Sequence, residues 1–274
     1  MLTEAEIQRY SRQILLSQVG GAGQERLKAS RALVVGAGGL GSPAALYLAA
    51  AGVGAVGVCD DDRVDLTNLQ RQVIHSTEDL GRPKVESAAA RLRALNPEIR
   101  VVEHPVRLRA ANALELLAGY DAVVDGSDTF PSKFLVNDAC VAAEVPFVFC
   151  GILGFEGQLL TVVPGAGPCL RCFFRRPPPP GAVPTCAQAG ILGPVAGVMG
   201  SLQALEVLKL LLGTGPVATG RLLVFDGADR RFREIEIHRD PRCPACGDPA
   251  FRRPLADEDA PVCPESGAGS APAR

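Results

Sequence analysis

The chain lacks an excess of charge of either sign. Its 28 lysines and arginines nearly balance 30 aspartates and glutamates, which gives a formal net charge of -2 at pH 7. General binders of nucleic acid or of anionic membrane surfaces carry a basic excess that this composition does not supply. We therefore expect no nucleic-acid partner and no membrane partner.

The first twenty residues also lack a long apolar run. Residues 1–20 are polar and charged, so they contain no core of a secretory signal, and we expect a cytoplasmic protein. One long apolar stretch does occur, over residues 191–212. Its polar residues Gln203, Glu206 and Lys209 share one helical stripe. This pattern is typical of a helix packed inside a protein core, not of one inserted in lipid.

Cysteine is present, but not in the pattern of a disulfide framework. The chain has nine cysteines, an odd number, and four of them form two C-x-x-C pairs. Two such pairs supply four thiolates for a tetrahedral zinc ion. A redox dithiol is the alternative, but proline-rich surroundings make it less favoured. The distribution suits a reducing cytoplasm and a zinc site with four cysteine ligands. The predicted ligands are Cys169, Cys172, Cys243 and Cys246.

Glycine, in contrast, is concentrated where a phosphate could be held. Residues 32–35 are apolar and predict a buried strand, and residues 40–51 predict a helix. Glycines at G-x-G-x-x-G spacing join the two, and this is the layout in which backbone N–H groups meet a phosphate. A tight turn that binds nothing is the alternative. The predicted nucleotide contacts are Gly36, Gly38, Gly39 and Gly41.

Acidic and polar residues follow the next strand. Residues 55–59 predict a strand that ends at Asp60, a position from which an acid commonly bonds ribose hydroxyls. Residues 64–72 are dense in polar side chains able to bond phosphate or sugar. Lys84 begins a predicted helix, where the helix dipole disfavours a cation unless an anion is near. That mismatch favours a functional role for Lys84.

A later strand, residues 121–125, runs into Asp128 at the carboxyl edge of the predicted sheet. Ligands of open parallel sheets lie outside that edge, so Asp128 is a candidate magnesium ligand. Asp125 is equally suited to cap the following helix, predicted over residues 132–143.

Together these elements predict an α/β fold with a Rossmann-like parallel sheet. After residue 151 the strands come without crossover helices, which indicates an antiparallel extension of the same sheet. We expect residues 1–248 to form a single domain and residues 249–274 to be a disordered tail. Cys186 follows a four-proline run in a predicted exposed loop, where a cysteine can act as a nucleophile or have no special role.

Several motifs in order carry a resemblance to a known family. They are Arg-Tyr-Ser-Arg-Gln at 9–13, the glycine turn at 36–41, Asn-Leu-Gln-Arg-Gln at 68–72, Gly-Arg-Pro-Lys-Val-Glu-Ser at 81–87, Gly-Ser-Leu-Gln-Ala-Leu-Glu at 200–206 and both C-x-x-C pairs. From Arg9 to Cys246 the chain resembles the MoeB/ThiF family of ubiquitin-activating-type adenylyltransferases. The resemblance implies an enzyme that uses ATP to activate the C-terminal Gly-Gly carboxylate of a ubiquitin-like sulfur-carrier protein as an acyl-adenylate.

The resemblance also implies roles for single residues. Asp60 would hold ribose, Asp128 would organise Mg²⁺, and Arg12 would reach into the neighbouring subunit of a homodimer. The glycines would form the nucleotide turn, and the four paired cysteines would hold Zn²⁺. The implied phosphate contacts are Asn68, Arg71 and Lys84.

Two departures from the family pattern occur, Thr129 where many relatives have Asn and the proline-rich loop before Cys186. Cys186 matches the loop cysteine of the family, for which we expect an auxiliary covalent role in sulfur transfer. No rhodanese domain follows, so the sulfur donor is expected to be a separate protein, a cysteine desulfurase or a rhodanese.

Other functions fit parts of the sequence. An enzyme that activates a tRNA-bound carboxylate, as in tRNA threonylcarbamoyladenosine dehydratases, would share the scaffold. An NAD-dependent oxidoreductase would explain the glycine turn and Asp60, but not Arg71, Lys84 or the cysteine pairs. A carrier-binding scaffold without activity is a further alternative. The sequence leaves open which pathway a carrier would serve: molybdopterin, thiamin, thiolated tRNA or cysteine synthesis.

Overall fold

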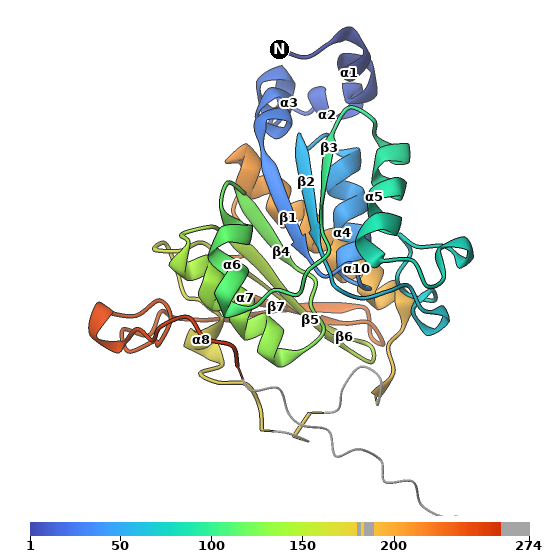
Figure 1. The fold of residues 1–274 in the computed structure, drawn as a ribbon. Helices are drawn as coiled ribbons and strands as arrows, with labels where there is room; N and C mark the ends of the chain where they lie inside the picture. Colours follow the sequence, from blue (N-terminus) through green and yellow to red (C-terminus); the bar gives the residue numbers. More distant parts are fainter. Residues whose placement is uncertain (180–181, 184–188, 259–274) are drawn as a thin grey trace, which may run out of the picture.

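One eight-stranded sheet runs through the protein in a computed structural model that describes residues 1–179, 182–183 and 189–258 (Figure 1). The strand order is β3-β2-β1-β4-β5-β6-β7-β8. Strands β1 to β5 pair in parallel and β6 to β8 continue the sheet antiparallel, as predicted. The strands are β1 Arg31–Val35, β2 Ala55–Cys59, β3 Arg100–His104, β4 Ala122–Asp125, β5 Phe147–Leu153, β6 Glu156–Val162, β7 Arg221–Asp226 and β8 Arg231–Glu236.

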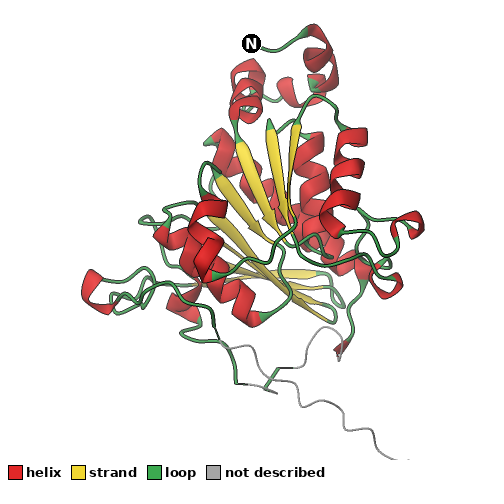
Figure 2. Ribbon diagram, in the orientation of Figure 1, coloured by secondary structure: helices red, strands yellow, loops and turns green. Residues whose placement is uncertain are grey.

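Helices cover both faces of this sheet (Figure 2). The α-helices are α1 Glu4–Arg9, α2 Ser11–Ile14, α3 Gly20–Ala29, α4 Gly41–Ala50, α5 Lys84–Leu95, α6 Ala110–Leu117, α7 Phe130–Ala142, α8 Leu170–Phe173 and α10 Gly193–Leu212. Short 3₁₀ helices among the described residues are η1 Leu66–Asn68, η2 Thr77–Asp79 and η3 Pro249–Phe251. Helices α4, α5 and α10 pack on one face, and α6 and α7 pack on the other.

Strand β1 shows why the parallel strands read as continuous apolar runs. Successive side chains of a strand point to opposite faces, so a strand covered on both faces is apolar throughout. Ala32 and Val34 belong to the core beneath α4 and α10, whereas Leu33 and Val35 belong to the core beneath α6 and α7. This arrangement fixes the end of β1, and therefore the start of the glycine turn, between two packed layers.

Helix α10 is long and apolar enough to cross a membrane by length and composition. It instead packs against α4 and against strands β4, β5 and β6. Its polar stripe faces the sheet: Gln203 Nε2 donates to Val148 O at 2.8 Å, and Glu206 Oε2 accepts from Thr161 Oγ at 2.7 Å. The prediction of a core helix is confirmed by this packing.

The first part of the predicted tail has defined contacts. Asp257 Oδ1 accepts a hydrogen bond from the Ala110 N–H at 2.9 Å, and Leu255 packs against the core beneath α6 and α7. Residues 259–274 and Cys186 lie outside the described residues.

Candidate nucleotide site and cysteine cluster

The glycine turn leaves no room for side chains at two of its positions. Gly36 has a φ of +93°, and a Cβ there would lie 2.7 Å from Gly126 O. A Cβ on Gly41 would lie 1.8 Å from Gly36 O. Gly126 follows β4, so the turn packs where β1 and β4 end together. The chain order reverses between these two strands, and ligands of open α/β sheets bind at such a point.

Beyond Gly36 the turn offers free backbone donors. Within the part of the chain that the structure describes, nothing accepts a hydrogen bond from the N–H groups of Gly38, Gly39 or Leu40. Helix α4 begins at the next residue, Gly41. The positive end of its dipole raises the positive electrostatic potential around these N–H groups. Free N–H groups at a helix N-terminus form a site for a phosphate or another anion.

Asp60 holds this turn from the second strand. Its Oδ2 accepts a hydrogen bond from the Ala37 N–H at 2.7 Å, and its Oδ1 accepts one from the Asp62 N–H at 2.9 Å. Burial raises the pKa of the Asp60 carboxyl, and Lys84 opposes that rise. The carboxylate that we expect to bind ribose is therefore also a backbone support of the turn.

Lys84 lies beside the same carboxylates. Its Nζ is 2.8 Å from Asp62 Oδ2 and 4.0 Å from Asp60 Oδ2, and the residue is 6% exposed. The anion that a lysine at this helix start requires is therefore supplied by the chain itself. The position of a lysine at a helix N-terminus therefore does not by itself indicate an external ligand. The ammonium group still has N–H donors that could bind one.

Arg71 lies over the glycine turn. A Cβ built on Gly39 would be 3.4 Å from Arg71 Cγ, and the guanidinium donates to Thr67 O at 3.0 Å. Asn68 sits one turn earlier, where its carbonyl accepts from the Arg71 N–H at 3.1 Å. Asn68 and Arg71 are two of the three predicted phosphate contacts. The segment that carries them is thus packed against the turn, although 27 residues separate Val35 from Arg63 in the sequence.

Asp125 and Asp128 have different environments at the end of β4. Asp125 is fully buried, and its Oδ2 lies 3.3 Å from Lys133 Nζ. The idea that Asp125 caps the next helix is wrong, because the Thr129 side chain caps α7 by accepting from the Ser132 N–H. Asp128 is exposed and has no ion pair among the described residues, so its carboxylate is open to a cation.

Arg12 is not brought to this turn. Its neighbour Gln13 donates to Ala51 O, just past the end of α4. Helix α4 starts at the turn and its 10 residues span about 15 Å, so α2 lies at the opposite end of that helix. Figure 1 shows α1, α2 and α3 gathered where the parallel strands begin. Arg12 is exposed there.

The four paired cysteines do come together. Their sulfur atoms all lie within 4.8 Å of one another. Cys169 Sγ is 3.6 Å from Cys243 Sγ, and Cys172 Sγ is 3.3 Å from Cys246 Sγ. A tetrahedral zinc ion with Zn–S bonds of about 2.3 Å places its sulfurs about 3.8 Å apart, so the cluster fits that ion.

Comparison with known proteins gives a family match that covers the residues of this site. Residues 10–245 match the ThiF family. The chain belongs to the ThiF family. The resemblance seen in the sequence motifs is therefore confirmed, and it covers the turn, Arg71, Lys84 and the paired cysteines up to residue 245.

Two ThiF relatives cover nearly the whole chain. One is the sulfur carrier protein adenylyltransferase of Thermus thermophilus, 53% identical over 94% of this chain and 97% of the relative. The other is the SAMP-activating enzyme E1 of Haloferax volcanii, 49% identical over 90% of this chain and 91% of the relative. The adenylyltransferase and sulfurtransferase MOCS3 of Aedes aegypti is 48% identical, and the match covers 57% of its length.

Solved structures show the same fold. The crystal structure of E. coli MccB with ATP superposes with a TM-score of 0.77 at 26% identity, covering 88% of this chain and 75% of that one. PaaA superposes with a TM-score of 0.73 at 26% identity, over 87% and 76% of the two chains. The mixed sheet with a parallel half and an antiparallel extension is thus the architecture of these proteins too.

Sequence reasoning missed two side chains that support the ThiF site. Lys133 Nζ donates to Ser127 O at 2.7 Å and pairs with buried Asp125. His75 Nε2 lies 3.0 Å from Ala37 O, inside the glycine turn. A lysine within an apolar helix is a signal that could have indicated the first. No sequence signal indicates the contact of His75, because His75 and Ala37 are 38 residues apart.

Proposed function

We propose that this ThiF protein adenylates the C-terminal Gly-Gly carboxylate of a ubiquitin-like sulfur-carrier protein at the expense of ATP. The observation that carries the proposal is the glycine turn with its free N–H groups, over which Arg71 lies and beside which Lys84 is held. The names of the relatives, a sulfur carrier protein adenylyltransferase and an E1 activating enzyme, support the same reaction.

The chemistry asks for positioning and positive charge. A carboxylate oxygen attacks the α-phosphorus of ATP, a new P–O bond forms, and the bond to the bridging oxygen of pyrophosphate breaks. Two negative groups approach each other, and the leaving group gains charge. Arg71, Lys84 and the N–H groups of the turn would stabilise that charge without forming covalent bonds. Asn68 would add a polar contact, and Asp60 would bind ribose through lone pairs that its backbone contacts leave free.

Asp128 is the residue that would hold Mg²⁺, because its carboxylate is exposed at the carboxyl end of β4. When bound, the ion would supply charge that offsets the phosphates. The buried Lys133–Asp125 pair joins the end of β4 to α7 and fixes the backbone that presents Asp128.

Arg12 would act in the site of a second copy of the chain. Its distance from the turn of its own chain excludes a role there, whereas a homodimer would bring it across. Apolar side chains near it are exposed: Ile7 of α1, and Leu15 and Leu16 just after α2, are 50%, 74% and 53% exposed. Exposed apolar side chains of this kind suit a subunit interface.

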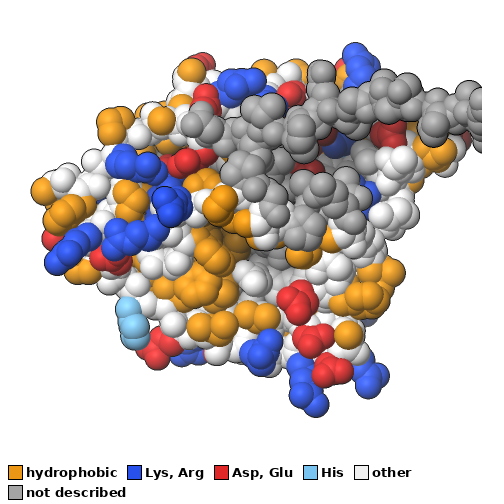
Figure 3. All heavy atoms as spheres, turned by 90° about the horizontal axis from the view of Figure 1, so that it is seen from below, with side chains coloured by type: hydrophobic (Ala, Val, Ile, Leu, Met, Phe, Trp, Pro, Cys, Tyr) orange, Lys and Arg blue, Asp and Glu red, His pale blue; other side chains and the backbone are white. Residues whose placement is uncertain are grey.

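The carrier would dock at the antiparallel end of the sheet. Figure 3 looks at the molecule from below and shows apolar side chains gathered on this face. Phe155, in the connection between β5 and β6, and Leu192 are about half exposed, and the Leu192 N–H donates to Gly154 O, which keeps the two segments adjacent. An apolar surface next to the carboxyl edge would receive a folded carrier while its tail enters the site.

The cysteines would serve two separate purposes. We assign Zn²⁺ to the cluster formed by the two C-x-x-C pairs, where it would join α8 to the segment after β8. Free buried cysteines such as Cys140 and Cys150 suit a reducing cytoplasm. Cys186 would act after adenylation, with sulfur delivered by a separate donor protein, so Cys186→Ala should leave pyrophosphate exchange unchanged.

The deciding experiment is ATP–pyrophosphate exchange. We expect exchange only with a carrier that ends in Gly-Gly, and none with the same carrier after removal of the last glycine. Arg71→Ala should reduce exchange by about 10²- to 10³-fold, the usual cost of losing one preorganised charge stabiliser. Arg82→Ala is the matched control: Arg82 is a nearby exposed arginine whose ion pairs with Asp79 and Glu86 are at the surface.

Several results would contradict the proposal. Exchange that ignores the carrier tail would exclude a Gly-Gly substrate. AMP formation that needs tRNA would favour activation of a tRNA-bound carboxylate, and a nicotinamide-dependent absorbance change would favour an oxidoreductase. Carrier binding without AMP formation would leave a scaffold without activity.

A further inference from the structure

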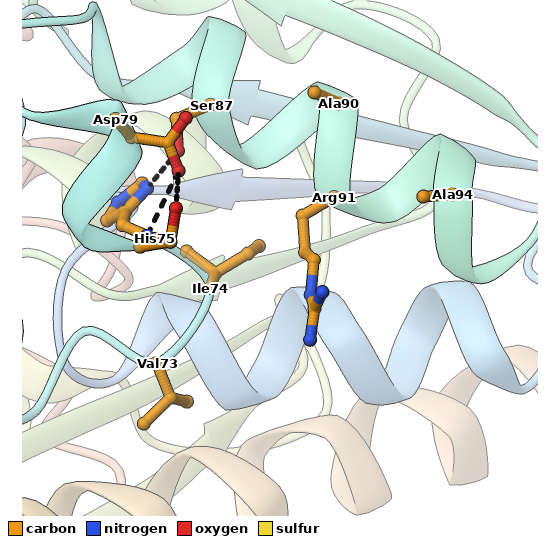
Figure 4. A pocket seen from close by; sticks show the side chains of 9 residues that line it. Val73, Ile74, His75, Asp79, Ser87, Ala90, Arg91 and Ala94 are labelled. Carbon is orange, nitrogen blue, oxygen red and sulfur yellow. Dashed lines mark hydrogen bonds between the residues drawn. The ribbon is translucent and has the colours of Figure 1, made fainter.

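The Ala37 residue of the glycine turn is held from both sides. Its N–H donates to Asp60 Oδ2 at 2.7 Å, and its C=O lies 3.0 Å from His75 Nε2. His75 comes from the segment between η1 and η2, and its other ring nitrogen, Nδ1, lies 2.8 Å from Ser87 Oγ on α5. The imidazole is buried, and its two ring nitrogens together bridge α5 to the turn. Figure 4 shows His75 beside Ser87.

The chemistry of these partners fixes the tautomer. A backbone carbonyl only accepts hydrogen bonds, so Nε2 must carry a proton. Burial lowers the pKa of His75, which favours the neutral ring at neutral pH. Nδ1 then accepts the hydroxyl proton of Ser87. The Ala37 carbonyl therefore selects the tautomer, and the Ser87 hydroxyl, which can donate as well as accept, is compatible with it.

Holding the Ala37 carbonyl has a consequence for the next N–H. The C=O of Ala37 and the N–H of Gly38 belong to one planar trans peptide and point in opposite directions. When His75 fixes the carbonyl on the α5 side, the Gly38 N–H is turned to the other side. That N–H is one of the donors of the turn for which the described residues offer no acceptor.

We propose that His75 is a positioning residue for ATP: through Ala37 O it orients the Gly38 N–H toward the nucleotide phosphates. This inference rests on the proposed function only in taking ATP as the ligand. A glycine-rich turn is intrinsically mobile because it has few side-chain contacts, so an external hydrogen bond to its backbone reduces the ordering needed when the nucleotide binds.

The surroundings of His75 provide a way to test this directly. A cavity of about 290 Å³ adjoins the ring, with Ile74, Ala90 and Arg91 among its lining residues (Figure 4). Removal of the imidazole by His75→Gly would enlarge this space, so free imidazole could enter and replace the missing ring.

The test compares two amide variants by calorimetric titration with ATP. The side-chain nitrogen of Gln reaches the position of His Nε2, whereas that of Asn reaches only the position of Nδ1. We expect His75→Gln to keep the ATP Kd within about threefold of wild type and His75→Asn to weaken it about tenfold, the size of one lost positioning hydrogen bond. In pyrophosphate exchange, His75→Asn should raise the KM for ATP and leave kcat nearly unchanged.

Two controls separate positioning from stability. His104→Gln changes a half-buried histidine, which bonds Tyr120 on the opposite face of the sheet, and should leave the ATP Kd unchanged. His75→Gly should bind ATP weakly, and added imidazole should restore the affinity in a saturable way.

Two outcomes would overturn the inference: equal ATP affinity of the Asn and Gln variants, or no effect of imidazole on His75→Gly. Wild-type protein that binds ATP but shows no exchange with any carrier would instead overturn the adenylation proposal. The ATP Kd values of the His75 variants could still be compared in that case. A failure of the positioning inference is therefore distinguishable from a failure of the adenylation proposal.

Discussion

The glycine turn and the cysteine cluster are sites built in opposite ways. In the turn the atoms that would meet a ligand are backbone N–H groups, and they are held by residues from distant segments: Asp60, His75 and Gly126. In the cluster the reactive atoms are side-chain sulfurs, carried by two short segments with identical spacing. The turn depends on glycines, which have no side chain, and the cluster depends on the side-chain sulfurs of cysteines.

This difference predicts how each site fails. Loss of one thiol removes a ligand and leaves the backbone intact. Addition of one methyl group to the turn removes no ligand, but displaces the backbone that carries the donors. Variants in the two regions should therefore separate metal content from nucleotide binding.

The largest effect is expected in the cluster. Cys169→Ser should abolish zinc binding, measured as metal per chain after purification, and lower the free energy of unfolding by more than about 4 kcal/mol, as loss of a structural metal does. Cys169 is fully buried, so the change cannot be relieved by solvent. Cys140→Ala is the control: it also opens a fully buried position, but it should keep the full metal content. Equal zinc content in the two variants would show that the four paired cysteines do not bind the zinc.

A smaller effect is expected at the turn. Gly41→Ala places a methyl group against Gly36 O and should cost about 3 kcal/mol of unfolding free energy, the upper range for overpacking. ATP binding should be lost while zinc is retained. Gly21→Ala is the matched control, because a Cβ there meets nothing within 4 Å and Ala is favoured in a helix. A Gly41→Ala protein that binds ATP normally would show that the turn does not hold the nucleotide.

The same contrast explains what the sequence could predict. Strand β2, Ala55–Cys59, was predicted because an apolar run reflects burial on both faces, whereas β8, Arg231–Glu236, is exposed along its whole length and lacks that signal. The grouping of the four paired cysteines was predicted from spacing alone. Asp60 was placed correctly at the end of β2, but its bond to the Ala37 N–H depends on how two loops meet in space. His75 was missed for the same reason, since a contact between a backbone oxygen and a distant side chain leaves no periodic signal. Lys133 carried a signal that was not used, a lysine within an apolar helix.

The smallest expected effect is on the pH dependence of the unfolding free energy, through the protonation of His75. Its pKa in the folded protein lies below the ordinary 6.5 because the ring is buried. The unfolded chain therefore binds a proton more readily, and the stability due to the neutral ring is present above pH 6.5 and declines as pH falls through the folded pKa. As the pH falls from about 7.5 to about 5.5, wild type should lose more stability than His75→Gln, whose side chain does not titrate.

Urea unfolding at both pH values measures that difference. His104, whose pKa burial also lowers, titrates in both proteins, so its contribution cancels. Equal losses in the two proteins would mean that His75 is charged in the fold. An imidazolium would still donate from Nε2 to Ala37 O, but it would no longer need the Ser87 hydroxyl proton at Nδ1. Ser87→Ala should nevertheless weaken ATP binding in both states, because the Ser87 hydroxyl donates to a neutral Nδ1 and accepts from a protonated one.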